Sequence, residues 1–103
     1  MDELGVEWAE SALRALEEAA EYISKDSPAY AAVLVVGAIQ RAESLARFPQ
    51  RGRAVPEYRD AEVREVFVGS YRLIYRILPE RVLILAFVHS ARDLAGILTR
   101  SPE

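Results

Sequence analysis

The chain contains no cysteine, and among its 103 residues histidine, lysine, methionine and tryptophan occur once each. Without cysteine there can be neither a disulfide framework nor a thiolate metal site, and a single histidine argues against a zinc site. No apolar run approaches the roughly 20 residues of a membrane span, and the acidic start lacks the pattern of a secretion signal. We therefore expect a cytoplasmic protein with no metal and no cofactor.

The charge is unevenly distributed along a chain whose length predicts one domain spanning residues 1–103. The net charge of −3 divides into −6 over residues 1–26 and +3 over the remainder. All basic residues except Lys25 are arginines, which favours bidentate contacts to carboxylate or phosphate. The pI of about 5.2 is far below the value above 9 expected for a domain held mainly by nucleic-acid phosphates.

The first half of the chain predicts a short strand followed by two helices. The strand is expected over residues 4–8. The first helix should end near Ser24, and a second should run over about 28–47, with Ser27 as its N-cap and Pro28 at its first position. The apolar stripe of the first helix consists of Ala12, Leu13, Leu16, Ala20 and Ile23.

The second helix is unusual because residues 30–39 are almost uninterruptedly apolar or small. The β-branched residues 33–36 would also suit a buried strand. The cap, the length and the helical spacing of Leu34, Ala38 and Ala42 favour the helix. A helix that is apolar all round needs cover on its second face, so we expect a partner groove between the helices.

The second half predicts an antiparallel meander of strands over residues 62–68, 71–77 and 82–89, preceded by an arginine-bearing loop over 50–60. A short C-terminal helix is expected over 91–100. The predicted fold class is therefore α+β, with the N-terminal strand and helix hairpin packed on one face of an antiparallel sheet.

The dipeptide Gly69-Ser70 suits a two-residue type II′ turn, which would fix the pairing of the flanking strands. Glu65 then lies on the same face as Arg72 and Arg76. If residues 78–81 form a four-residue turn and side chains alternate regularly along the next strand, Phe87 lies beside Arg72 on this face. The three charged residues could form a structural ion pair or serve a function, and the sequence leaves both possibilities open.

Several motifs, in order along the chain, resemble the superfamily of ParE and RelE toxins from type II toxin–antitoxin modules. The resemblance covers about residues 4–98, and the last two of its motifs look more like the ParE branch. The motifs are Val6-Glu7-Trp8 before the first helical stripe, Phe48-Pro49 with Gly52-Arg53, Arg64-Glu65, Tyr71-Arg72-Leu73-Ile74-Tyr75-Arg76, and His89-Ser90-Ala91-Arg92-Asp93-Leu94.

The resemblance implies a stress-linked toxin, of a kind associated with plasmid stabilisation, that a cognate antitoxin keeps inactive in a hetero-oligomer. ParE-like members are associated with poisoning DNA gyrase by binding. RelE-like members cleave mRNA on the ribosome without a metal. A solitary member that has lost its toxicity is a third possibility.

An RNA-cleaving toxin would need a base, a phosphate clamp and an acid. The candidates are Glu57 as base, Arg72 as clamp, and His89 or Arg92 as the remaining component. His89 could equally be a polar cap that bonds Asp93. The net acidity argues against docking on ribosomal RNA, so the sequence favours binding without catalysis and leaves the enzyme question open.

The antitoxin is expected to contact basic residues within 41–76, because the first helix carries the acidic side chains. The candidate residues for antitoxin or target binding are Tyr30, Val33, Leu34, Arg53, Glu65, Arg72, Arg76, Phe87, His89 and Arg92.

Overall fold

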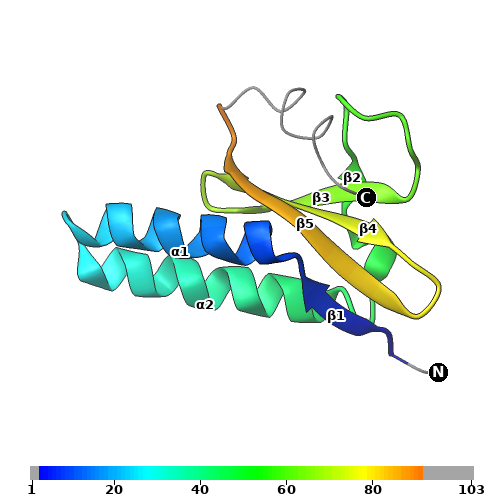
Figure 1. The fold of residues 1–103 in the computed structure, drawn as a ribbon, viewed down its shortest axis with the longest axis horizontal. Helices are drawn as coiled ribbons and strands as arrows, with labels where there is room; N and C mark the ends of the chain where they lie inside the picture. The colour runs from blue at the N-terminus through cyan, green and yellow to red at the C-terminus, as the bar shows by residue number, and fades with distance from the viewer. Residues whose placement is uncertain (1–2, 92–103) are drawn as a thin grey trace.

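Two helices lie side by side on one face of a five-stranded sheet in the computed structural model, which describes residues 3–91 (Figure 1). This arrangement confirms the predicted α+β class; the expected C-terminal helix lies outside the described residues. The elements are β1 (Gly5–Trp8), α1 (Glu10–Ser24), α2 (Pro28–Ser44), the short 3-10 helix η1 (Pro49–Arg51), β2 (Arg53–Ala54), β3 (Val63–Val68), β4 (Tyr71–Ile77) and β5 (Arg81–His89).

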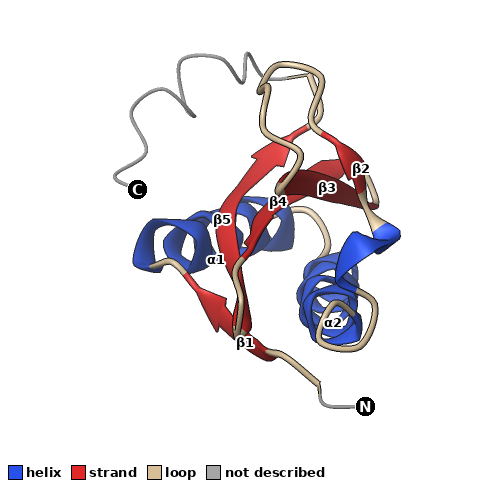
Figure 2. Cartoon of the chain, turned by 90° about the vertical axis from the view of Figure 1, so that its right-hand side faces the viewer, coloured by secondary structure: helices blue, strands red, loops and turns tan. Residues whose placement is uncertain are grey.

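The strand order across the sheet is β1-β5-β4-β3-β2. Strand β1 pairs in parallel with β5, and all other neighbours are antiparallel. Figure 2 shows α1 beneath the β5 side of the sheet and α2 beneath the β3 side. The sequence had predicted only a loop over 50–60, whereas the structure adds η1 and the two-residue strand β2 there.

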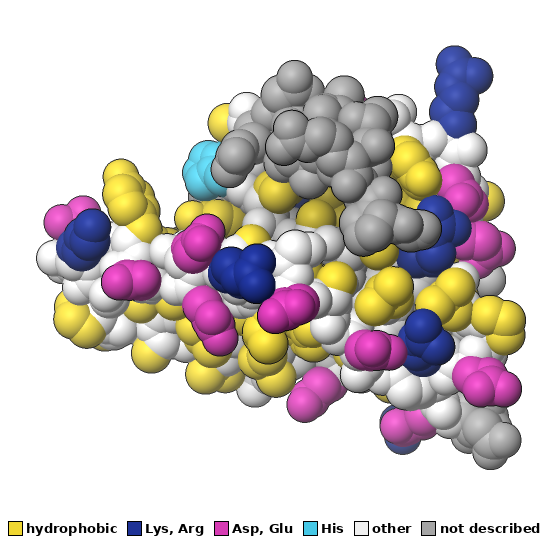
Figure 3. Space-filling model, viewed as in Figure 1, with side chains coloured by type: hydrophobic (Ala, Val, Ile, Leu, Met, Phe, Trp, Pro, Cys, Tyr) yellow, Lys and Arg dark blue, Asp and Glu magenta, His cyan; other side chains and the backbone are white. Residues whose placement is uncertain are grey.

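Helix α1 buries one face and exposes an acidic one. Ala12 and Leu16 are buried against the sheet, while Glu17, Glu18 and Glu21 are exposed. In the space-filling view the acidic side chains follow α1 (Figure 3). The predicted polarity of this helix is therefore confirmed except at Leu13, which was placed in the apolar stripe but is 41% exposed.

Residues 33–36 are helical, so the strand alternative for this segment is wrong. The Ser27 hydroxyl accepts a hydrogen bond from the backbone N–H of Tyr30 at 3.1 Å, and Pro28 stands at the first helical position, as predicted. Helix α2 ends at Ser44, a little before the predicted boundary. Its buried face consists of Ala31, Leu34, Ala38 and Ala42.

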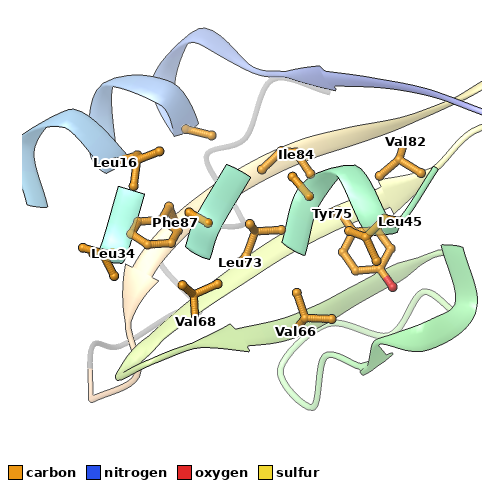
Figure 4. Close-up of a cluster of buried hydrophobic side chains, with 13 residues drawn as sticks. Leu16, Leu34, Leu45, Val66, Val68, Leu73, Tyr75, Val82, Ile84 and Phe87 are labelled. Atoms are coloured by element: carbon orange, nitrogen blue, oxygen red, sulfur yellow. The ribbon is translucent and has the colours of Figure 1, made fainter. Parts of the chain in front are cut away.

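The main core lies between the helices and the sheet (Figure 4). Leu73 and Tyr75 of β4 and Ile84 of β5 are fully buried there and meet Leu16 and Leu34 from the helices. A fully buried aliphatic side chain contributes roughly 1.5–3 kcal/mol. Within residues 3–91, neither helix has the length and hydrophobicity needed to cross a membrane.

The β3–β4 hairpin has the predicted register, with Val68 opposite Tyr71 and Glu65 opposite Ile74. Gly69 has φ +58°, and Ser70 has no positive φ, which are the signs of φ that a type II′ turn requires. The turn thus sets which side chains of both strands face the helices. Tyr71, Leu73, Tyr75 and Ile77 face the helix side, as predicted.

The predicted position of Phe87 is wrong. A bulge between Ile74 and Tyr75 makes their β5 partners jump from Ala86 to Ile84, so that Leu85 is an extra residue. The extra residue reverses the alternation that follows it. Phe87 therefore pairs with Leu73 and faces the helices, and the neighbour of Arg72 is Val88.

Candidate functional site

The sheet face opposite the helices carries a buried ion pair between β3 and β4. The side chain of Glu65 is fully buried and that of Arg72 is 7% exposed. Arg72 Nε lies 2.6 Å from Glu65 Oε1, and Arg53 Nε of β2 lies 2.6 Å from Glu65 Oε2. Both oxygens of the buried carboxylate are therefore bound by arginine, and one of these arginines comes from the edge strand.

Glu57 binds the two terminal nitrogens of the Arg72 guanidinium. Its two carboxylate oxygens accept bonds of 2.9 and 3.1 Å from the terminal nitrogens of Arg72. These hydrogen bonds hold the pKa of Glu57 below its usual value, and Glu57 and Glu65 in turn raise the pKa of Arg72. Arg72 is thus a charge-balanced group with a carboxylate on each side.

A second ion pair fastens the same loop farther along the sheet. Arg76 lies 2.9 Å from Asp60 Oδ2 and 3.5 Å from the Tyr58 hydroxyl. The pKa of Asp60 is lowered, first by the backbone N–H of Glu62 and then by Arg76. The segment 55–62, called the cover loop below, is therefore joined to the sheet through Glu57 and Asp60.

The cover loop and the sheet enclose a small second core. Its buried members are Val55, Val63, Ile74, Ala86 and Val88, and Tyr58 and Leu85 pack against them. This face of the sheet therefore carries apolar side chains beside its arginines, and residues 55–62 of the chain itself cover part of it.

The loop that precedes β2 is fixed to the main core through Tyr75. The Tyr75 hydroxyl donates to the Pro49 carbonyl at 2.6 Å and accepts from the Gly52 N–H at 2.9 Å. A Cβ on Gly52 would lie 2.5 Å from the Glu65 carbonyl oxygen and 2.6 Å from the Tyr75 hydroxyl oxygen. Gly52 is required by this close approach, a role beyond that of an ordinary turn residue.

The four candidates for RNA cleavage are not all brought together. Glu57 and Arg72 are bonded to each other on the face away from the helices. His89 lies on the helix side, because it packs edge-on against Tyr71, which stacks on Phe87 of the main core. Its Nδ1 accepts a hydrogen bond from the Ala91 N–H. Arg92, as well as Asp93, lies outside the described residues.

The candidate binding residues divide into exposed and buried groups. Tyr30 and Val33 on α2 are 50% and 64% exposed, and neighbouring Val36 is 53% exposed. Leu34 and Phe87 are buried in the main core, and Leu34 also lines the hollow beside α2 that is described next. Glu65 and Arg72 are buried in the ion pair, Arg76 is partly buried, and Arg53 is exposed.

A hollow lies beside α2, between that helix and the end of β3. The sequence had predicted a groove in a different place, between the two helices. Tyr30, Val33 and Gly37 line its helix side, and Val68 lines its strand side. Arg41, which belongs to the basic range 41–76 but was not among the individual candidates, lines the same hollow. The spacing of residues 33, 37 and 41 along one helical face is the signal that could have revealed it.

Residues 3–91 contain no group of three or more histidine, cysteine, aspartate or glutamate side chains that could hold a metal ion. The acid–base groups of the described face are instead bonded to arginine. What this face can offer chemically is therefore shape, apolar surface and partly exposed arginine.

The family model described as the ParE toxin of the type II toxin–antitoxin system parDE matches residues 6–94. A search of curated protein sequences gave no significant match.

Two of the solved structures that are similar to the chain come from toxin–antitoxin systems. A chromosomal ParDE toxin–antitoxin system from P. aeruginosa has a TM-score of 0.68 at 17% identity, with 84% of this chain and 95% of that chain covered. A RelBE2 toxin–antitoxin complex from Mycobacterium tuberculosis has a TM-score of 0.58 at 27% identity, with 84% and 98% covered.

Proposed function

We propose, because the chain belongs to the ParE family of toxins from type II toxin–antitoxin systems, that it poisons DNA gyrase by binding to it and cleaves no RNA. The proposal places this action in the cytoplasm and in a single toxin domain spanning residues 1–103. A cognate antitoxin neutralises the toxin.

One observation carries the preference for binding. Glu57 and Arg72, the candidates for base and phosphate clamp, neutralise each other through a bidentate ion pair. Arg72 also bonds Glu65, so a phosphate would have to compete with two carboxylates for one guanidinium. His89 lies across the sheet from them. General acid–base catalysis needs its groups within about 3 Å of the reacting atoms, and groups on opposite faces of one sheet do not reach the same reacting atoms.

The exposed apolar side chains of α2 support an antitoxin as partner. Tyr30, Val33 and Val36 are at least half exposed on one helix, and contiguous apolar surface of this kind marks an interaction site. The acidic surface of α1 is poorly suited to an acidic partner (Figure 3). We therefore assign antitoxin contact to the α2 side and to basic residues within 41–76. Among the candidate arginines that the structure describes, Arg53 is the most exposed.

The test is a pair of assays on the same purified toxin. Supercoiling of a relaxed plasmid by the gyrase heterotetramer is measured in one, and cleavage of mRNA on programmed ribosomes in the other. We expect toxin-dependent inhibition of supercoiling and intact mRNA. Ribosome-dependent cleavage that is lost in Glu57→Ala, with gyrase unaffected by the wild-type toxin, would overturn the proposal in favour of a RelE-like ribonuclease.

Glu57 is the better residue for this test than Arg72. Removing the Glu57 carboxylate leaves Arg72 paired with Glu65, whereas removing Arg72 leaves Glu65 buried with one partner fewer. The circular dichroism spectrum and unfolding temperature of Glu57→Ala provide the folding control. A toxin inactive in both assays, although folded, would point to a member without toxicity.

A further inference from the structure

The cover loop, residues 55–62, lies on the sheet face away from the helices and is attached there by few side chains (Figure 1). Val55 is fully buried at its start, and Tyr58 packs against the second core. The carboxylates of Glu57 and Asp60 reach the sheet, although each side chain keeps 36% of its surface exposed. The remaining residues of the loop, Pro56, Arg59, Ala61 and Glu62, are exposed. The loop is therefore held mainly by two ion pairs and two apolar contacts.

The sheet beneath the loop is complete without it. Strands β3, β4 and β5 bond one another along their lengths, and the main core lies on their other face. Among the described residues, the backbone of 56–61 makes no hydrogen bond to β4 or β5. It bonds only the residues that flank it, through the Tyr58 N–H to the Val55 carbonyl and through the Asp60 carbonyl to the Val63 N–H. This segment can therefore lift off while the sheet stays folded.

Lifting the loop takes a carboxylate away from each of two arginines of β4. Arg72 gives both terminal nitrogens to Glu57 at 2.9 and 3.1 Å, while its Nε bonds Glu65. Once Glu57 leaves, the bond to Glu65 still fixes the guanidinium, so its fork is oriented in advance for another carboxylate. Arg76 likewise donates to Asp60 at 2.9 Å. The two carboxylates of the loop therefore stand where those of a partner would bind.

The loop itself indicates which chemistry this face accepts. Glu57 and Asp60 stand three positions apart, and Tyr58 between them packs on the second core. A protein segment with carboxylates on either side of an apolar residue would make the same contacts. A nucleic acid would need phosphate contacts along its length, and the fully buried Glu65 carboxylate beside Arg72 opposes a phosphate.

We propose that the cover loop is an autoinhibitory strap, which must lift before an acidic segment of the toxin's protein target can bind Arg72 and Arg76. The proposal rests on the proposed function, which supplies DNA gyrase as the target. A protein whose binding-competent form is only fractionally populated binds with an affinity reduced by that fraction. Loosening the strap therefore strengthens binding, provided that the arginines remain.

Two substitutions break the same ion pair from opposite sides and should act in opposite directions. Asp60→Asn loosens the loop and leaves the arginine in place, and its side-chain carbonyl can still accept the bond from the Glu62 N–H. A partly exposed ion pair changes an equilibrium by roughly two- to fivefold, so the toxin concentration that half-inhibits gyrase supercoiling should fall by that factor. Arg76→Gln loosens the loop as well but removes the cation, so this concentration should rise about threefold or more.

Amide hydrogen exchange measures the lifting of the loop directly. The Tyr58 amide should exchange roughly two- to fivefold faster in both variants than in wild type. The amide of fully buried Leu73, in the main core, should keep its wild-type rate and so report an intact fold.

Glu62→Gln is the matched control. It removes the same charge from an exposed residue of the loop whose side chain bonds no other described residue. It should change neither the exchange at Tyr58 nor the inhibition of gyrase. Circular dichroism and unfolding temperature verify that each variant is folded.

Several outcomes would overturn the strap. Unchanged exchange at Tyr58 in Asp60→Asn means that the ion pair does not hold the loop, and faster exchange without stronger inhibition means that the loop does not block the target. Stronger inhibition by both variants overturns the arginine contact. Tighter binding of single-stranded RNA, or of the product of the adjacent open reading frame, to Asp60→Asn, with gyrase inhibition unchanged, assigns the covered face to that partner and overturns the proposal.

Failure of the strap and failure of the proposed function are distinguishable in these assays. A strap that fails while the wild-type chain inhibits gyrase leaves the proposed function intact. A wild-type chain that leaves supercoiling unaffected contradicts the proposed function itself, and it overturns gyrase as the partner of the covered face whatever the exchange at Tyr58.

Discussion

Glu65 and Arg72 form a buried ion pair across β3 and β4, with Arg72 Nε 2.6 Å from Glu65 Oε1. They stand diagonally across the hairpin, because Arg72 is opposite Phe67 and Glu65 is opposite Ile74. Arg53 and Glu57 complete the pair on either side. The cluster therefore joins β2, β3, β4 and the cover loop.

Replacing one member of this pair should be costly. Arg72→Ala removes one of the two arginines that neutralise the buried Glu65 carboxylate. We expect a loss of about 3–5 kcal/mol in the free energy of unfolding. Glu65→Leu combined with Arg72→Met removes both charges and should lose less. Urea denaturation measures both variants, and a double variant less stable than Arg72→Ala would contradict this account.

Acid should weaken the attachment of the cover loop. The pKa of Glu57 is lowered in the folded state. Its contribution to the free energy of unfolding is therefore present above its unfolded-state pKa and is lost as the pH falls through its folded-state pKa. The stability difference between wild type and Glu57→Gln should therefore be largest near neutral pH and shrink below about pH 4. Urea unfolding at a series of pH values measures this stability difference, and a difference that grows in acid would contradict the prediction.

Gly52→Ala should destabilise the loop before β2. The added methyl group meets the Glu65 carbonyl, which is backbone and cannot rotate aside. Overpacking of this kind costs about 1–3 kcal/mol. Gly5→Ala is the matched control, since its nearest contact would be an ordinary 3.8 Å. Thermal unfolding of both variants is the measurement, and equal effects would show that Gly52 is not a special position.

Two adjacent residues of α2 should respond very differently to truncation. Leu34→Ala removes a side chain that is 4% exposed and should cost about 2–5 kcal/mol, whereas Val33→Ala should stay within about 0.5 kcal/mol. Val33→Ala should nevertheless weaken antitoxin binding if the α2 surface is the docking site. Urea unfolding and a binding titration on the same two proteins separate stability from recognition.

Local signals explain which parts of the fold could be predicted. Gly69-Ser70 determines the register of β3 and β4 because the turn itself fixes which residues are opposite each other. Ser27 and Pro28 similarly identify the start of α2 from adjacent residues alone. The N-terminal strand, the two helices and the hairpin were therefore predictable.

The parts that failed depend on distant contacts. The bulge at Leu85 arises where β5 packs on β4, and no residue near it signals an extra position. The partner of Glu57 lies fifteen residues away on β4, and this contact, together with the pair of Asp60 and Arg76, attaches the cover loop. Candidate residues such as Glu57 and Arg72 could be named from sequence, but their mutual neutralisation could not.

The parallel pairing of β1 with β5 joins the two ends of the described chain, Gly5 with Arg81. A growing chain cannot complete this sheet until β5 has left the ribosome, and such non-local pairing is slow to form. The helices are synthesised early and must wait with their apolar faces uncovered. The toxin would therefore complete this sheet only after β5 has been synthesised, and an antitoxin already present could capture it at that point.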